Sequence, residues 1–123
     1  MQKWIGNGKM DIKRGDILFV NFEPVRGREQ GRMRPALVVQ NDILNKFSPL
    51  TIVAPITSKI YKKEYPHNIF IKKYDSGLDK DSTILLNQIR TIDKLRIIKR
   101  LSYLNFELMK KVDNALKVSL GLD

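Results

Sequence analysis

The stretch that decides the fold is Asp16-Ile17-Leu18-Phe19-Val20-Asn21-Phe22, a run rich in β-branched and aromatic residues. Its composition predicts the first strand of the main domain. Successive side chains of a strand point to opposite faces, so Leu18 and Val20 share one face while Ile17 and Phe19 share the other. Both faces are therefore apolar. This pattern predicts a strand covered on two sides, as in a small barrel or at an interface between subunits.

A basic loop follows this strand and leads into the next apolar run, Ala36 to Val39. Residues 23–35 hold two glycines and two prolines, which shape a loop because glycine permits positive φ and proline fixes its own φ. The loop also carries four arginines within residues 26–34, where Glu29 is the only acid. The planar, permanently charged guanidinium suits phosphate recognition, so the loop indicates a phosphodiester site. A basic surface loop that only aids solubility is the alternative.

The rest of the pattern predicts further short strands and one terminal helix. We expect strands at 35–40, 51–57, 68–72, 82–92 and 97–103, a turn or short helix at 41–47, and a turn at 74–81. Pro55 falls inside a predicted strand, which favours an edge strand or a bulge there. Residues 106–120 have the period of a helix that packs on the core, with Asn105 as N-cap and Gly121 as stop. The sequence therefore predicts a mainly β (α+β) barrel with a C-terminal helix.

Composition limits the possible functions. The chain has 123 residues, a net charge of +10, no cysteine and one histidine, His67. This length suits one domain with its own core. The lack of cysteine excludes a disulfide framework and a thiolate metal site, and one histidine excludes any site that needs two imidazoles. The positive charge favours a polyanionic partner, with nucleic acid ahead of a membrane.

The sequence also carries expectations about organisation and location. There is no run of about eighteen apolar residues and no evident secretory leader, so we expect no membrane association and a cytoplasmic location. Residues 1–12 read as a flexible N-terminal extension, and residues 13–123 read as a single barrel domain.

Several motifs occur in the order of a known protein family. They are Arg14-Gly15-Asp16, the loop with Gly27-Arg28-Glu29-Gln30-Gly31 and Arg34-Pro35, then Pro55-Ile56-Thr57, and Leu86-Asn87-Gln88-Ile89-Arg90-Thr91-Ile92-Asp93. Over residues 13–120 the chain closely resembles the MazF/PemK (Kid) toxins of bacterial toxin–antitoxin systems. The resemblance implies an SH3-like barrel of the CcdB/Kid/PemK type. It also implies an mRNA interferase, a homodimeric endoribonuclease that cleaves single-stranded RNA at specific sequences without a metal or other cofactor.

The resemblance assigns roles to individual residues. Arg34 matches the family's catalytic arginine, and Thr57 matches its catalytic threonine. Cleavage without metal proceeds by attack of the 2′-hydroxyl on the adjacent phosphorus, so we expect both residues to stabilise charge on the phosphorane. Arginine is a poor general base because it keeps its proton, although Arg34 could protonate the leaving group. Glu29 is either the proton acceptor or a structural partner of the arginines, and its catalytic role stays open.

A wider set of residues is expected to bind RNA. Amides can read base edges, which single-stranded RNA presents freely, so Asn87 and Gln88 are candidates for base contacts. If residues 87–92 form a strand, Gln88 and Arg90 lie on one face. Tyr61 and Tyr65 could stack on bases, or belong to a mobile cover over the site. The full set of expected RNA-binding residues is Arg28, Gln30, Arg32, Ser58, Lys59, Asn87, Gln88 and Arg90.

The resemblance also implies a partner that controls the enzyme. A free cytoplasmic ribonuclease harms its host, so we expect a cognate acidic, MazE-like antitoxin that occludes the cleft. Two other functions remain open from the sequence: a non-catalytic nucleic-acid-binding barrel and a CcdB-like topoisomerase poison. The pair Arg34 and Thr57 favours cleavage over mere binding, and the arginine loop argues against the poison. His67 matches no catalytic position.

Overall fold

The computed structural model describes residues 4–5, 9–22 and 33–123. In chain order the elements are β1 (Trp4–Ile5), β2 (Lys9–Met10), β3 (Asp16–Asn21), β4 (Met33–Val38), α1 (Asp42–Phe47), β5 (Leu50–Thr57), β6 (Asn68–Ile71), α2 (Lys73–Ser76), β7 (Ser82–Leu85), the 3-10 helix η1 (Leu86–Gln88), β8 (Arg90–Asp93), the 3-10 helix η2 (Lys94–Arg96), β9 (Ile97–Tyr103) and α3 (Phe106–Leu120).

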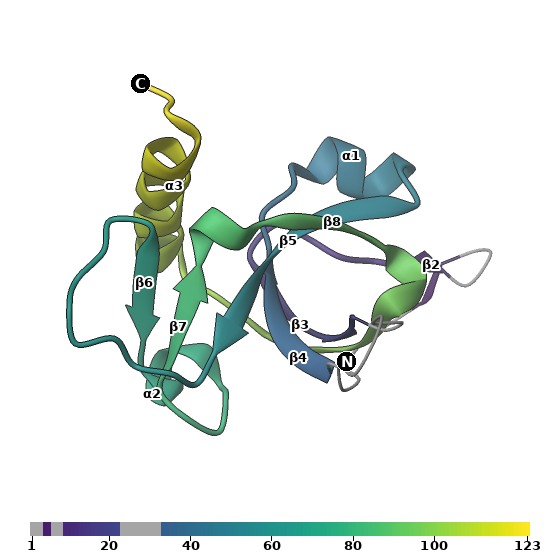
Figure 1. The fold of residues 1–123 in the computed structure, drawn as a ribbon. Coiled ribbons are helices and arrows are strands. Elements are labelled where there is room, and N and C mark those ends of the chain that lie inside the picture. The colour runs from purple at the N-terminus through teal and green to yellow at the C-terminus, as the bar shows by residue number, and fades with distance from the viewer. Residues whose placement is uncertain (1–3, 6–8, 23–32) are drawn as a thin grey trace, which may run out of the picture.

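One antiparallel sheet organises these elements. Its strands run in the order β6-β7-β5-β4-β3-β9, and β8 pairs with the first half of β5. Figure 1 shows β3, β4, β5 and β8 curving around one side of the molecule, while β6 and β7 lie with α3 on the other side. The prediction of a mainly β barrel with a C-terminal helix is confirmed.

The central strands are buried on both faces, as the apolar pattern of β3 predicted. Ile17 of β3 packs in a core that includes Val112 and Ala115 of α3. Leu18 and Val20, which point the other way, pack in a second core inside the barrel. β4 and β5 alternate in the same manner, so each strand contributes to both cores. This double burial fixes the register of the sheet, because a slip by one residue would exchange the two faces.

The strand that carries Pro55 differs from its predicted position. β5 is neither an edge strand nor bulged against β4, since it pairs with β4 on one side and with β8 and β7 on the other. Residues 50–53 pair with β8 and residues 56–57 pair with β7, so Pro55 falls between the two pairings. Proline has no N–H to donate to a sheet. Because β5 changes its partner strand at this position, neither the pairing with β8 nor the pairing with β7 needs the N–H that Pro55 lacks.

Two further local predictions were wrong. Residues 82–92 do not form one strand, because η1 interrupts them between β7 and β8. The segment 74–81 is not turn alone, since it begins inside α2, which ends at Gly77 in the left-handed conformation at φ +73°. The first difference follows from the change of partner along β5: β7 and β8 both run antiparallel to β5 on the same side, and η1 carries the chain from one pairing to the other.

The Arg14-Gly15-Asp16 motif has a structural function. Arg14 forms an ion pair with Asp113 of α3 at 2.7 Å, and its Nε donates to the carbonyl of Val39. The buried carboxylate of Asp16 accepts from the Nε of Arg100 at 3.0 Å and from its own turn at Lys13 N. The motif therefore joins the start of β3 to α3 and to β9.

Local interactions also define both ends of α3. Asn105 caps α3 by accepting from the N–H of Leu108, and Gly121 ends the helix at φ +71°, as predicted. Toward the N-terminus, β1 pairs with β2 in antiparallel fashion, and Ile12 is buried in the barrel core. Within the described ranges, no helix is both long enough and apolar enough to cross a membrane.

Candidate functional site

A cavity of about 600 Å³ opens at the C-terminal end of β5. Arg34 and Pro35 of β4 line it together with Thr57 and Ser58. Pro35 pairs with Phe19 and Ala36 pairs with Pro55, so the sheet register places the end of β5 beside the start of β4. The motifs Arg34-Pro35 and Pro55-Ile56-Thr57, which lie far apart in sequence, therefore meet at one wall.

The hydroxyl of Thr57 is held by the turn that follows it. The N–H of Lys59 donates to Thr57 Oγ1 at 3.2 Å, and Thr83 Oγ1 donates to the Lys59 carbonyl at 2.8 Å. Two hydrogen bonds therefore fix the chain direction just after β5. Thr57 is half-buried, and its own O–H donates to no acceptor in the described part of the chain. The hydroxyl proton is available to a group in the cavity.

A second cavity of about 300 Å³ lies on the other side of Arg34. Phe22, Pro55, Gln88 and Arg90 line it together with Arg34. The guanidinium carbon of Arg90 lies 4.9 Å from the centre of the Phe22 ring, which holds the arginine over an aromatic face. Gln88 comes from η1 and Arg90 from β8, so the 3-10 turn between β7 and β8 places both on one cavity.

Arg34 separates the two cavities and is exposed. Among the residues that the structure places, no carboxylate lies within ion-pair distance of its guanidinium. Arg34 is thus a permanent cation at the junction of two hollows, one with a hydroxyl and one with an amide and a second guanidinium. Such a junction can hold an anionic group while its two substituents enter the two cavities.

Four of the predicted site residues lie outside the described residues. They are Arg28, Glu29, Gln30 and Arg32, which all belong to the loop between β3 and β4. Their predicted roles stay predictions. The described neighbours of the loop, Phe22 and Arg34, both line the second cavity.

The other predicted RNA-binding residues either line one of the cavities or lie outside both. Ser58 lies in the large cavity, and Gln88 and Arg90 share the small one. The prediction that Gln88 and Arg90 face one side therefore agrees with the structure, although a 3-10 turn rather than a continuous strand places them there. Lys59 and Asn87 are exposed and line neither cavity.

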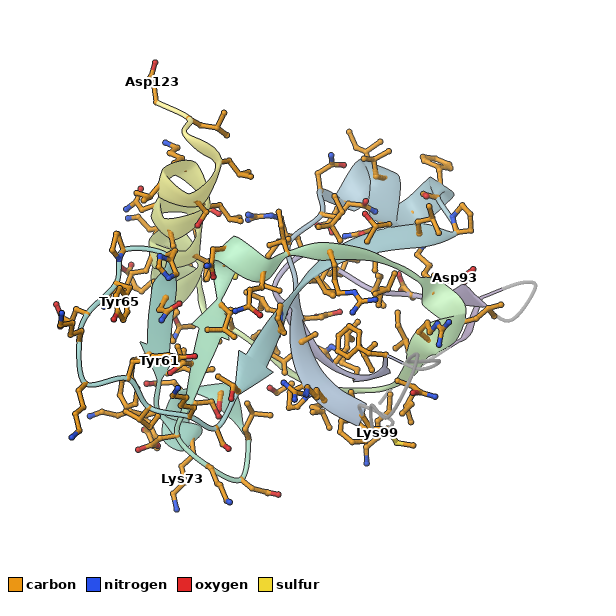
Figure 2. The ribbon with its side chains drawn as sticks, viewed as in Figure 1. Tyr61, Tyr65, Lys73, Asp93, Lys99 and Asp123 are labelled. Carbon is orange, nitrogen blue, oxygen red and sulfur yellow. The ribbon has the colours of Figure 1, made fainter. Side chains whose placement is uncertain are left out.

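The aromatic loop after β5 also lies outside both cavities. Tyr65 stacks on His67 with ring centres 5.4 Å apart, and Tyr61 meets Tyr65 edge-on at 6.2 Å. Figure 2 shows the two tyrosines beside β6, on the opposite side of β5 from Lys99. The Nζ of Lys59 lies 4.8 Å from the centre of the Tyr61 ring. These side chains therefore form a cluster of their own.

Sequence reasoning missed the far wall of the large cavity. This wall consists of Phe19 from β3, Lys99 and Leu101 from β9, residues 77–80 after α2, and Ser82 at the start of β7. No sequence spacing indicates it, because β3 and β9 are paired across about eighty residues of chain. In the described parts of the chain, no group of three His, Cys, Asp or Glu side chains could hold a metal ion.

Comparison with known families identifies one match. Residues 13–120 match the family described as PemK-like, MazF-like toxin of type II toxin–antitoxin system. The match spans β3 to α3 and so includes every described wall of both cavities.

Individual relatives agree with the family match. The chain is 51% identical over 113 residues to the endoribonuclease EndoA of Bacillus subtilis, covering 92% of this chain and 97% of the relative. A solved MazE–MazF complex from Deinococcus radiodurans (Form-II) is similar with a TM-score of 0.75 and 27% identity, covering 92% of this chain and 98% of that one. The toxin MazF-mt6 of Mycobacterium tuberculosis, at 18% identity and a TM-score of 0.74 over 88% of this chain and 98% of its own, shares the fold.

Proposed function

Because the chain belongs to the PemK-like, MazF-like toxins of type II toxin–antitoxin systems, we propose that it is an endoribonuclease that cuts single-stranded RNA at the junction of its two cavities. One observation carries the proposal: Arg34 stands between the cavities, and the Thr57 hydroxyl, free to donate, faces the larger one. The 51% identity to a relative named as an endoribonuclease supports the same reaction.

The proposed reaction needs no group beyond RNA and protein. The ribose 2′-oxygen attacks the adjacent phosphorus and loses its proton, while the bond to the 5′-oxygen breaks and that oxygen gains a proton. The products are a 2′,3′-cyclic phosphate and a 5′-hydroxyl. Negative charge grows on the non-bridging oxygens, and fixed donors at that position supply a large part of catalysis. Arg34 and Thr57 are the donors that this mechanism uses.

Arg34 and Glu29 are the candidates for the acid and the base of the reaction. The guanidinium group is a hydrogen-bond donor with no acceptor, so Arg34 suits charge stabilisation and donation to the leaving oxygen more than proton removal. Glu29 remains the proposed acceptor, or the residue that orders the arginines of its loop. Arg28, Gln30 and Arg32 extend the proposed RNA contacts on the same loop, with Ser58 and Lys59 after β5 and Asn87 on η1.

The small cavity is the proposed place for a base next to the cut. The guanidinium of Arg90, held over the buried Phe22 ring, can stack on a base, and the amide of Gln88 can pair with a base edge. The amide of Asn87 lines neither cavity, so a base contact there would involve a nucleotide further along the strand.

The first expected result concerns metal. Purified protein incubated with a long RNA in excess EDTA should cleave at the same sites and rate as in magnesium, because the proposed charge stabilisers are side chains. Mapping the ends should give a 5′-hydroxyl and a 2′,3′-cyclic phosphate at each cut. Activity that disappears in chelator and returns with magnesium would contradict the mechanism, and intact RNA under both conditions would leave only a non-catalytic binding barrel.

We also propose that the enzyme is a homodimer that uses the face around α1. Ile43, Leu44 and Phe47 of α1, Leu50 of β5 and Leu95 of η2 are all large, apolar and exposed. Lys94 joins these elements, since its N–H donates to the Pro49 carbonyl and its Nζ donates to the Asn45 carbonyl. A contiguous apolar surface of this kind is typical of a protein interface.

The second expected result tests this face. Phe47→Asp should convert the dimer to a monomer in light scattering, because it places a charge in an apolar interface where Phe47 is 69% exposed in the single chain. Tyr74→Asp is the matched control, since Tyr74 is 90% exposed on α2, away from α1. A Phe47→Asp protein that stays dimeric would place the interface elsewhere.

The biological setting is proposed from the family. A MazE-like antitoxin with an acidic, unfolded binding segment would cover Arg34 and the cavity mouths, since opposite charge speeds encounter with a chain of net charge +10. The complex would hold the enzyme inactive in the cytoplasm. Release of the antitoxin then exposes the cavity to RNA.

A further inference from the structure

The far wall of the large cavity contains an acid in a place where RNA binding alone would not put one. Asp79 lines the cavity together with Arg34, Lys80 and Lys99. A carboxylate there repels phosphate and weakens the attraction of a polyanion. Its presence beside three cations therefore suggests a ligand group that donates a hydrogen bond, which a carboxylate can accept and a cation cannot.

An ion pair does not account for Asp79. Among the residues that the structure describes, neither lysine lies within 4 Å of its carboxylate, and no hydrogen bond or ion pair involves the side chain. Asp81, two residues further on, behaves differently because its carboxylate accepts from the N–H of Lys73 at 2.8 Å. Asp81 holds the loop, whereas Asp79 is left facing the cavity.

The loop that carries Asp79 is fixed on both sides. Before it, Gly77 closes α2 with φ +73°, and the N–H of Leu78 donates to Ser76 Oγ at 3.0 Å. A side chain at Gly77 would meet Ser102 Cβ at 3.2 Å, so close packing on β9 also fixes the loop. After it, Ser82 Oγ donates to the Lys80 carbonyl at 2.9 Å. A group presented by a fixed loop can select a ligand, because its geometry is set before binding.

The surroundings of Asp79 suit a nucleobase. Phe19, Leu78 and Leu101 are half-buried apolar side chains on the same wall, and apolar or aromatic surfaces support the face of a base. Lys80 and Lys99 are exposed and can follow the phosphate on either side. Figure 2 shows Lys99 near the start of β4, the strand that carries Arg34.

We propose that Asp79 reads one base beside the cut and selects a base with an exocyclic amino group against uracil. An ionised carboxylate only accepts hydrogen bonds. The amino groups of adenine, cytosine and guanine donate to it. Uracil offers one N–H between two carbonyl oxygens, which the carboxylate repels. The inference rests on the proposed RNA cleavage and adds a specificity residue to it.

The test maps every cut made in a long RNA by the wild-type protein, Asp79→Asn, Asp79→Ala and Asp75→Asn. The wild-type should disfavour uracil at one position next to the cut by on the order of 10–100-fold, the range of one good base contact. An asparagine both donates and accepts, so Asp79→Asn should accept uracil at that position while other positions keep their preference. Asp79→Ala should lose the preference there and cut more slowly.

Asp75→Asn is the matched control, because Asp75 lies on α2 outside both cavities and its replacement makes the same change in net charge. It should leave every preference unchanged. An unchanged pattern in Asp79→Asn, or the same general rise in rate in both asparagine variants, would overturn the role of Asp79 and leave RNA cleavage standing. A wild-type protein that cuts no RNA would overturn both the cleavage proposal and this inference.

Discussion

Replacing Arg34 with alanine is expected to slow RNA cleavage by on the order of 10²–10³-fold, the usual cost of one fixed donor to a developing oxyanion. Arg34 is exposed, belongs to neither core and stands between the two cavities. The loss should therefore appear in turnover rather than in stability. Single-turnover rates on a short RNA with one cut site, with circular dichroism as a check on the fold, measure both.

Two further variants sharpen this result. Arg34→Lys keeps the charge but loses the planar fork, so it should recover only part of the rate. Arg90→Ala is the matched control, because Arg90 lines the small cavity alone and packs on Phe22. It should weaken RNA binding more than it slows the chemical step. If Arg34→Ala cut RNA at the wild-type rate, the reaction would take place elsewhere on the protein.

The largest effect on stability is expected at Asn45. This side chain is 2% exposed, and its Oδ1 accepts from Gln40 Nε2 at 3.0 Å and from Thr51 Oγ1 at 2.7 Å. Its Nδ2 donates to the Gln40 carbonyl at 2.9 Å and to Asp42 Oδ1 at 3.1 Å. One buried amide thus joins α1 to the start of β5.

Asn45→Ala should lower the free energy of unfolding by roughly 2–4 kcal/mol, because it leaves buried polar groups without partners and opens a small cavity. The melting temperature should fall by about 10 °C. Asn45→Leu keeps the branched shape but is bulkier and loses the hydrogen bonds, and should be at least as unstable. Asn87→Ala, an exposed asparagine on η1, is the control and should change the melting temperature by less than about 2 °C. Equal melting temperatures for Asn45→Ala and Asn87→Ala would show that the hydrogen bonds of Asn45 add no net stability to the folded protein.

Local patterns predicted the elements well where one signal dominated. The two-faced apolar pattern of β3, the period of α3 and the caps Asn105 and Gly121 are all properties of short stretches, and the structure matches them. The meeting of Arg34 with Thr57 was predicted through the family resemblance. The register of β4 on β5 gives it a physical basis.

What the sequence did not predict depends on long-range pairing. Pro55 was expected on an edge strand or at a bulge because proline lacks a donor, yet β5 meets that need by changing partners between β8 and β7. η1 follows from the same change. The wall with Lys99 and Asp79 requires β9 to pair with β3 and the loop after α2 to fold against the end of β5. No local sequence pattern predicts that these residues, which lie far apart in the chain, meet at one wall.

The most direct measurement is a crystal structure with a short RNA whose 2′-hydroxyl at the cut is replaced by hydrogen, so that it binds but cannot react. The account predicts that the scissile phosphate lies between Arg34 and Thr57, with a non-bridging oxygen within hydrogen-bond distance of each, and that the flanking nucleotides enter the two cavities. An RNA bound to another face, with both cavities empty and Arg34 in water, would contradict it.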